Sequence, residues 1–205
     1  MKPIPVHNLT RRNLARQGVS HPFLTPLLCA LTLGILGSSC TATEKSYTVP
    51  EALCETPISS DLLTPLLAPG KELSTVSNNK TQSIRRCRIY IDGKEALSAS
   101  SEWLNKDKQL RDVAARSYNY VEPNDAVSDD GMYIYSDTGA IGRVICTRPP
   151  TASERVFASI RVSDAGRPDA AALSKLIRAY SEALKDSQHC KNQKNWTPEP
   201  NRTWQ

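Results

Sequence analysis

The chain has 205 residues and a formal net charge of +5. Four of its 26 Lys and Arg residues precede Cys40 and all 21 Asp and Glu residues follow it, so the remainder is nearly neutral, with 22 basic and 21 acidic residues. A nucleic-acid-binding protein concentrates basic residues on one face, whereas the one dense basic group, Arg85, Arg86 and Arg88, divides between the two faces of a strand, so we expect no nucleic-acid partner.

Residues 1–39 have the features of an export signal. They carry no acidic residue, and an apolar run from about Phe23 to Leu36 follows four basic residues, Lys2, Arg11, Arg12 and Arg16. Such a pattern, with small residues before the cleavage site, is typical of a secretory signal peptide. The run contains Pro26 and is shorter than the roughly 18 to 20 residues that a membrane span needs. We therefore predict a location outside the cytoplasm.

The paired arginines of this leader indicate a possible export route. Arg11 and Arg12 precede an apolar residue, Leu14, and a further basic residue, Arg16. This segment resembles a twin-arginine export signal. An ordinary basic segment of the general secretory route is the alternative.

Cys40 is a candidate lipid-attachment site. It follows Leu36-Gly37-Ser38-Ser39, which resembles a bacterial lipobox, although the lipobox leucine normally lies three residues before the cysteine. Cleavage after Ser39 or Ala42 without a lipid is the alternative. The lipid hypothesis gives a protein anchored to the outer face of the cell membrane through lipidated Cys40, with palmitate among the expected acyl groups.

The rest of the chain is long enough for one domain with a substantial core. We predict a lipidated tether at residues 40–48, a domain at 49–190 and a flexible polar tail at 191–205, since the tail lacks apolar periodicity.

Within this domain the elements follow in a simple order. Ser59-Ser60-Asp61 predicts the cap of a short leucine-rich helix. Alternating apolar residues and the Asp92-Gly93 turn signal predict a hairpin. The expected segments are a helix to residue 67, a polar loop at 74–83, strands at 84–91 and 94–104, a helix at 105–121, strands at 132–135, 141–146 and 155–162, and a long C-terminal amphipathic helix from 166. This order predicts an α+β fold with a mainly antiparallel sheet of about five strands covered by helices.

Four cysteines follow the lipid site: Cys54, Cys87, Cys146 and Cys190. An even set in an exported protein predicts two disulfides, and three pairings are possible. A zinc site is the weaker alternative, because structural zinc ligands usually come in closely spaced pairs and no two of these cysteines are close in sequence.

These features resemble one family. A cysteine, Cys54, precedes a leucine-rich helix, and a second lies in the first strand, within Cys87-Arg88-Ile89-Tyr90, behind a lipoprotein leader. The chain resembles, over roughly residues 49–190, actinobacterial secreted lipoproteins of unknown function from streptomycetes and mycobacteria. The resemblance implies a Cys54–Cys87 bridge and no particular reaction. We hypothesise the pairing Cys54–Cys87 and Cys146–Cys190.

Two features invite a catalytic interpretation. Asp137-Thr138-Gly139 resembles the signature of aspartic proteases, but that chemistry needs two such carboxylates and the signature occurs once; a hairpin turn explains it equally well. His189 is the single histidine after the leader. We expect it at the surface in the last turn of the long helix, where a cation is favourable, and predict no catalytic residues.

Ligand sites are equally sparse. Asp125, Asp129, Asp130 and Gly131 could offer oxygens to calcium, but their spacing differs from the helix-loop-helix calcium loop, so a solvated turn is expected, with no metal and no cofactor. The aromatic residues could line a cleft, although core and sheet positions are favoured: Trp103, Tyr118, Tyr120, Tyr133 and Tyr135.

Together these patterns predict a non-enzymatic, membrane-anchored binding or accessory lipoprotein of the cell envelope. Its partner would be a protein or a small molecule of the envelope. The alternative is a cell-wall hydrolase with an unrecognised carboxylate site.

Overall fold

The structure is a computed structural model that describes residues 44–78, 83–117, 120–146 and 153–191. The chain divides into two units, residues 1–40 and 41–205, and the second is described below. The export residues Arg11 and Arg12, the lipid site Cys40, residue Tyr118 and the expected tail from residue 192 lie outside the described residues.

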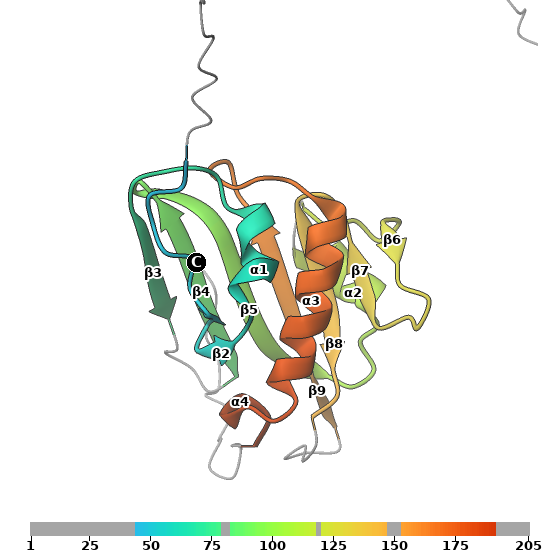
Figure 1. The fold of residues 1–205 in the computed structure, drawn as a ribbon. Coiled ribbons are helices and arrows are strands. Elements are labelled where there is room, and N and C mark those ends of the chain that lie inside the picture. The colour runs from blue at the N-terminus through green and yellow to red at the C-terminus, as the bar shows by residue number, and fades with distance from the viewer. Residues whose placement is uncertain (1–43, 79–82, 118–119, 147–152, 192–205) are drawn as a thin grey trace, which may run out of the picture. The chain divides into compact units, whose positions relative to one another are not determined.

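A seven-stranded antiparallel sheet forms the centre of the domain (Figure 1). The strand order is β3-β4-β5-β9-β8-β7-β6, so a meander of three strands and a meander of four strands meet where β5 pairs with β9. The strand bounds are β3 Leu73–Asn78, β4 Ile84–Ile91, β5 Lys94–Asn105, β6 Ala126–Val127, β7 Tyr133–Tyr135, β8 Gly139–Val144 and β9 Glu154–Val162. The α+β class and the antiparallel sheet are confirmed.

The expected number of about five strands is too low, because both edge strands escaped prediction. β3 after Leu73 falls in the expected polar loop at 74–83, and these residues are all exposed, so no apolar alternation marks the strand. β6 has two residues, both exposed. Edge strands of this kind are stabilised by backbone pairing and leave little trace in the sequence pattern.

The β4–β5 hairpin follows from its local sequence. Asp92 and Gly93 connect the strands with φ angles of 49° and 76°, the left-handed conformation that a two-residue hairpin turn requires. In β4, Cys87, Ile89 and Ile91 are buried and Arg86 and Arg88 are exposed, as the alternation predicted.

Helices α1 and α3 lie over the middle of one face of the sheet, and α2 lies on the other face (Figure 1). The first face carries α1 (Ser60–Leu63), the 3-10 helix η1 (Thr64–Leu66) and α3 (Ala170–Leu184). The second face carries α2 (Leu110–Ser117), which packs on β7, β8 and Phe157 of β9. α2 begins later than residue 105, because β5 continues to Asn105 in register with Glu154.

Helix α3 packs closely against the middle of the sheet. Leu173, Leu176, Ile177 and Tyr180 are fully buried, and the Asp169 carboxylate caps the helix by accepting a hydrogen bond from the Ala172 N–H at 2.9 Å. A Cβ atom at Gly142 of β8 would lie 2.4 Å from the Ser181 hydroxyl oxygen. Glycine at this position therefore permits the close approach of helix and strand.

The predicted helix that reaches His189 is divided into two. α3 ends at Leu184, and after a turn through Ser187 the short helix α4 (Gln188–Lys191) follows. Cys190 of α4 is joined to Cys146, just after β8. This bond holds α4 against the end of the sheet, away from the axis of α3.

Both hypothesised disulfides are present. Cys54 is bonded to Cys87, and Cys146 is bonded to Cys190. The first bond attaches the small β1–β2 hairpin (Ala52–Leu53 and Thr56–Pro57) to β4. The second attaches the end of the chain's last described helix to the central sheet.

Candidate functional site

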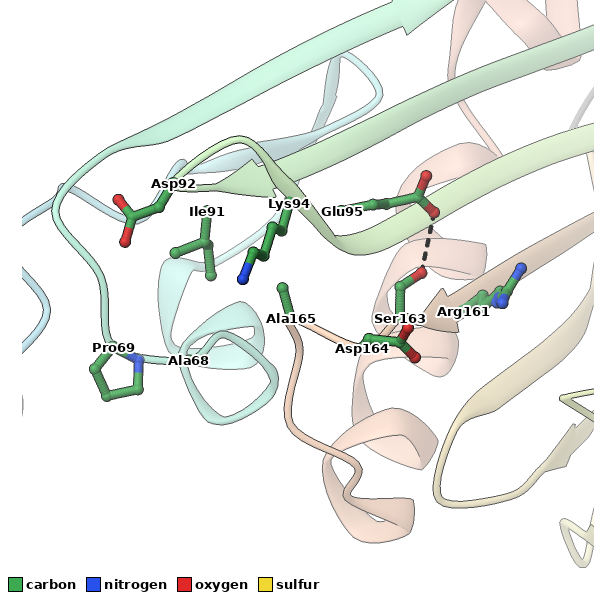
Figure 2. A pocket seen from close by; sticks show the side chains of 10 residues that line it. All are labelled: Ala68, Pro69, Ile91, Asp92, Lys94, Glu95, Arg161, Ser163, Asp164 and Ala165. Atoms are coloured by element: carbon green, nitrogen blue, oxygen red, sulfur yellow. Dashed lines mark hydrogen bonds between the residues drawn. The ribbon is translucent and has the colours of Figure 1, made fainter.

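A pocket of about 740 Å³ lies where the β4–β5 hairpin ends (Figure 2). Its walls come from three segments that are distant in sequence, after η1, at the β4–β5 hairpin and at the end of β9: Ala68, Pro69, Ile91, Asp92, Lys94, Glu95, Arg161, Ser163, Asp164 and Ala165. The pocket is therefore a product of the sheet topology.

Two hydrogen-bonded carboxylates fix the walls of this hairpin pocket. Asp92 accepts hydrogen bonds from the backbone N–H groups of Lys71 and Glu72, at 3.0 and 2.9 Å. Glu95 accepts one from the Ser163 hydroxyl at 3.0 Å (Figure 2). Both carboxylates thus hold loops of the pocket together.

A second hollow, of about 270 Å³, continues from the first along the sheet. We call it the arginine groove: Arg86 and Arg88 of β4, Arg161 of β9, and Ser98, Ser100 and Ser159 between them. Glu95 and Arg161 line both hollows. The groove lies on the second face of the sheet, beside the part that α2 covers.

Tyr120 forms the end of the groove nearest α2. The Arg161 guanidinium lies 5.7 Å from the centre of the Tyr120 ring, a cation–π distance. A Cβ atom at Gly139 would lie 2.1 Å from this ring, so the glycine of the Asp137-Thr138-Gly139 segment makes room for Tyr120. This gives that glycine a structural role.

The Asp-Thr-Gly segment is the turn between β7 and β8. The Ser136 hydroxyl accepts hydrogen bonds from the N–H groups of Thr138 and Gly139, at 3.1 and 3.0 Å, and donates one to the Tyr120 carbonyl at 2.5 Å. The hairpin interpretation of this segment is confirmed.

The placement of His189 at the surface is wrong. Its side chain is 3% exposed and its ring lies 6.0 Å from that of Trp103, centre to centre. The disulfide at Cys190 turns α4 inward and explains the burial. Burial, and to a lesser degree the Arg85 guanidinium, lower the pKa of His189 to about 4.

His189 belongs to a cluster of buried polar groups. The Tyr180 and Ser101 hydroxyls are buried beside one another, and the buried Trp103 indole N–H and Nε2 of His189 make no hydrogen bond within the described part of the chain. Burial raises the pKa of Tyr180, and Arg85 opposes that rise. The cluster lies on the α3 side of the sheet, separated from the groove by the sheet itself.

The acidic segment before β7 forms a structured turn. Asp130 accepts hydrogen bonds from the Ser128 hydroxyl at 2.5 Å, the Met132 N–H at 3.0 Å and the Arg178 guanidinium at 2.9 Å. Led by the Ser128 bond, these contacts lower the pKa of Asp130 to about 2. Arg178 also lies 4.6 Å from the Tyr133 ring centre, so the turn is fastened to α3.

The remaining predicted residues divide between core and surface. Trp103 and Tyr133 are buried core residues, Tyr135 is half-buried and Tyr120 lines the groove. Within the described ranges no three His, Cys, Asp or Glu side chains are grouped as a metal site would need. No helix in that part of the chain is long and apolar enough to cross a membrane.

Sequence reasoning missed the arginine groove. Arg161 lies 73 positions from Arg88 in the chain, and the two share a row of the sheet through Ser98, because β9 pairs with β5. No local pattern announces that pairing. The alternation in β4 placed Arg86 and Arg88 on one face and was the only available signal.

Comparison with known proteins gives no relative: the chain matches no protein-family model, no curated protein and no solved structure.

Proposed function

We propose that the protein is a lipoprotein anchored at the outer face of the cell membrane through Cys40, and that its domain is a non-enzymatic binding module of the cell envelope. The leader supports this location, and the resemblance to actinobacterial lipoproteins agrees with it. The observation that carries the binding role is the arginine groove, a hollow in the part of the second sheet face that no described helix covers, which continues into the hairpin pocket at the end of the sheet.

Contacts at the start of the domain support a position of the hairpin pocket near the membrane. The Ser46 N–H donates a 2.9 Å hydrogen bond to the Gly70 carbonyl, and the Tyr47 hydroxyl donates to the carbonyl of Ala68. Among the described residues, contacts with the rest of the domain start at Lys45, which also pairs with Gly70. Five residue steps join Cys40 to Lys45, a reach of at most about 18 Å. A lipid at Cys40 would keep this end of the domain near the bilayer.

A binding role suits the groove better than hydrolysis of the cell wall. A hydrolase needs carboxyl groups positioned for acid–base work, whereas two of the three carboxylates that line the hairpin pocket, Asp92 and Glu95, serve as hydrogen-bond acceptors that hold loops, the third being Asp164. We assign helix α3 a structural role as the long amphipathic helix that covers the core, because its large apolar residues are buried.

Membrane fractionation in the native host tests the address. The wild-type protein is expected in the membrane fraction, and Cys40→Ala is expected to release it or to block its processing. Cys29→Ala is the matched control, because this cysteine lies in the apolar part of the leader. A wild-type protein that is fully soluble, with an unmodified N-terminus, would contradict the anchor.

Photo-crosslinking in intact cells tests the binding face. Val76 on β3 and Val127 on β6 are exposed valines, 55% and 37% exposed, at opposite edges of the sheet. Val76 neighbours Arg88 across the strand pair. A photoreactive phenylalanine analogue at position 76 is expected to form a reproducible adduct, identified by mass spectrometry, that is absent with the same residue at 127. Equal labelling at both positions would contradict a binding face at the groove.

A further inference from the structure

The arginine groove owes its shape to the residue sizes on three neighbouring strands. Ser98 and Ser100 of β5 face the same side as Arg88 and Arg86 of β4, and Arg161 and Ser159 of β9 stand opposite them. The small serines form the floor, and the long arginines form the walls. Since neighbouring strands are about 4.8 Å apart, the backbones of the two walls are separated by roughly 10 Å.

The positive charge of this groove is only partly compensated. Nε of Arg88 lies 3.4 Å from a carboxylate oxygen of Glu95, whereas no carboxylate of the described residues forms an ion pair with Arg86 or Arg161. All three arginines are exposed. The groove therefore presents guanidinium groups from both walls to an incoming ligand.

The serine floor adds a hydrogen-bond donor. The hydroxyl oxygens of Ser100 and Ser159 are 2.7 Å apart. One of the two hydroxyl hydrogens forms this mutual bond, and the other remains able to donate elsewhere. Guanidinium forks and a hydroxyl donor together match an acceptor that has several oxygens pointing in different directions.

We propose that the arginine groove is a binding site for phosphate groups of a small phosphate ester. This deepens the proposed function, on which it rests, by naming the ligand class of the same face. A phosphate group can offer oxygens to the guanidinium groups of both walls and to the floor at once, whereas a carboxylate has only two oxygens. The near-neutral charge of the chain after the leader and the small volume of the groove, about 270 Å³, favour a short ligand over a nucleic acid, which would need an extended basic face.

Calorimetric titration of the full-length protein, purified in detergent, tests the assignment, with inorganic pyrophosphate as the probe. We expect saturable binding that weakens as salt is added. Arg86→Gln and Arg161→Gln are each expected to weaken it about tenfold or more, since each removes a charge-assisted contact. Arg111→Gln, an exposed arginine on α2 outside the groove, is the control and should bind as the wild type does.

Two results would overturn the proposal. One is the absence of pyrophosphate binding, or binding that the Arg86→Gln and Arg161→Gln variants retain. The other is citrate, a carboxylate of similar charge, binding as tightly as pyrophosphate. An adduct at position 76 in cells together with either result would leave the binding module standing and remove only its phosphate ligand.

The phosphate could belong to a lipid headgroup or to a soluble ester, and vesicles separate these sources. The unlipidated Cys40→Ala protein is mixed with phosphatidylcholine vesicles that contain or lack phosphatidylglycerol, and with glycerol 3-phosphate in solution. Arginine-dependent flotation with phosphatidylglycerol supports a headgroup, and arginine-dependent binding of glycerol 3-phosphate alone supports a soluble ester. Failure of both arms would contradict a phosphate-ester site.

Discussion

The two faces of the central sheet differ although the same strands build both. On β9, Val156, Ala158, Ile160 and Val162 are buried beneath α3, whereas Ser159 and Arg161 on the other side line a groove. The first face carries the larger core and both disulfides attach segments to it. The buried apolar cluster of the second face is smaller and lies under α2. Strand alternation thus places the larger core on one face and the groove residues on the other, and mutations should show whether stability and the proposed binding divide in the same way.

The largest expected loss of stability comes from releasing α4 from the first face of the sheet, which we call the covered face. Replacing Cys146 and Cys190 together by alanine opens a loop of 44 residues, for which the chain-entropy relation gives about 4 kcal/mol of unfolding free energy. Urea unfolding measures the loss. The pKa of His189, followed by NMR, should also rise toward its ordinary value, because α4 is no longer held inward.

The other disulfide provides the control for this experiment. A Cys54→Ala, Cys87→Ala variant should lose a similar stability, since its loop spans 33 residues, yet leave the pKa of His189 near 4. If the Cys146, Cys190 variant loses less than about 1 kcal/mol, the bond contributes little constraint and some other contact keeps α4 in place.

The covered face was also the easier one to predict. Val156 to Val162 and Cys87 to Ile91 alternate in apolarity, and Asp92-Gly93 fixes the hairpin, so β4, β5 and β9 could be placed within a residue or two. The burial of His189 could not be predicted, because it depends on where the Cys146–Cys190 disulfide holds the short helix α4. The meeting of Arg88 and Arg161 depends on the pairing of β5 with β9, a long-range event without a local signature.

Truncating the buried stripe of α3 tests the covered face directly. Leu176 is fully buried, so Leu176→Ala should lower the unfolding free energy by about 3 kcal/mol, within the usual range of roughly 2 to 5. Lys175→Ala, at the exposed neighbouring position, should change it by less than about 0.5 kcal/mol. Near-equal urea midpoints for the two variants would mean that α3 does not cover the core.

Acidification should weaken the covered face through His189. The folded protein holds the pKa of His189 near 4, against 6.5 for the free side chain. Between these values the unfolded chain binds a proton that the folded chain does not, so the unfolding free energy falls as the pH falls from about 6.5 to 4, by about 3 kcal/mol at most. Above pH 6.5 the full contribution of neutral His189 to the unfolding free energy remains.

A variant without a titrating group isolates this effect. His189→Phe retains a ring beside Trp103 and should flatten the stability profile between pH 6.5 and 4. Asp130 does not interfere, because its pKa falls from 3.8 to about 2 on folding, so its contribution is lost only at lower pH. An unchanged slope in His189→Phe would show that other groups govern the acid response.

The smallest effects on stability are expected on the second face of the sheet, which we call the open face. Small effects there are the most direct test of the difference between the two faces. Arg86→Gln should change the unfolding free energy by less than about 0.5 kcal/mol, because the side chain is exposed and no ion pair among the described residues includes it. Arg161→Gln should cost slightly more, up to about 1 kcal/mol, since its contact with Tyr120 is lost. Urea unfolding at neutral pH measures both. Small losses of stability, with a large loss of phosphate binding in the same variants, would show that the open face serves recognition and that the sheet beneath does not need it. Losses above about 2 kcal/mol would make the arginines part of the structural framework, and the separation of the two faces would then fail.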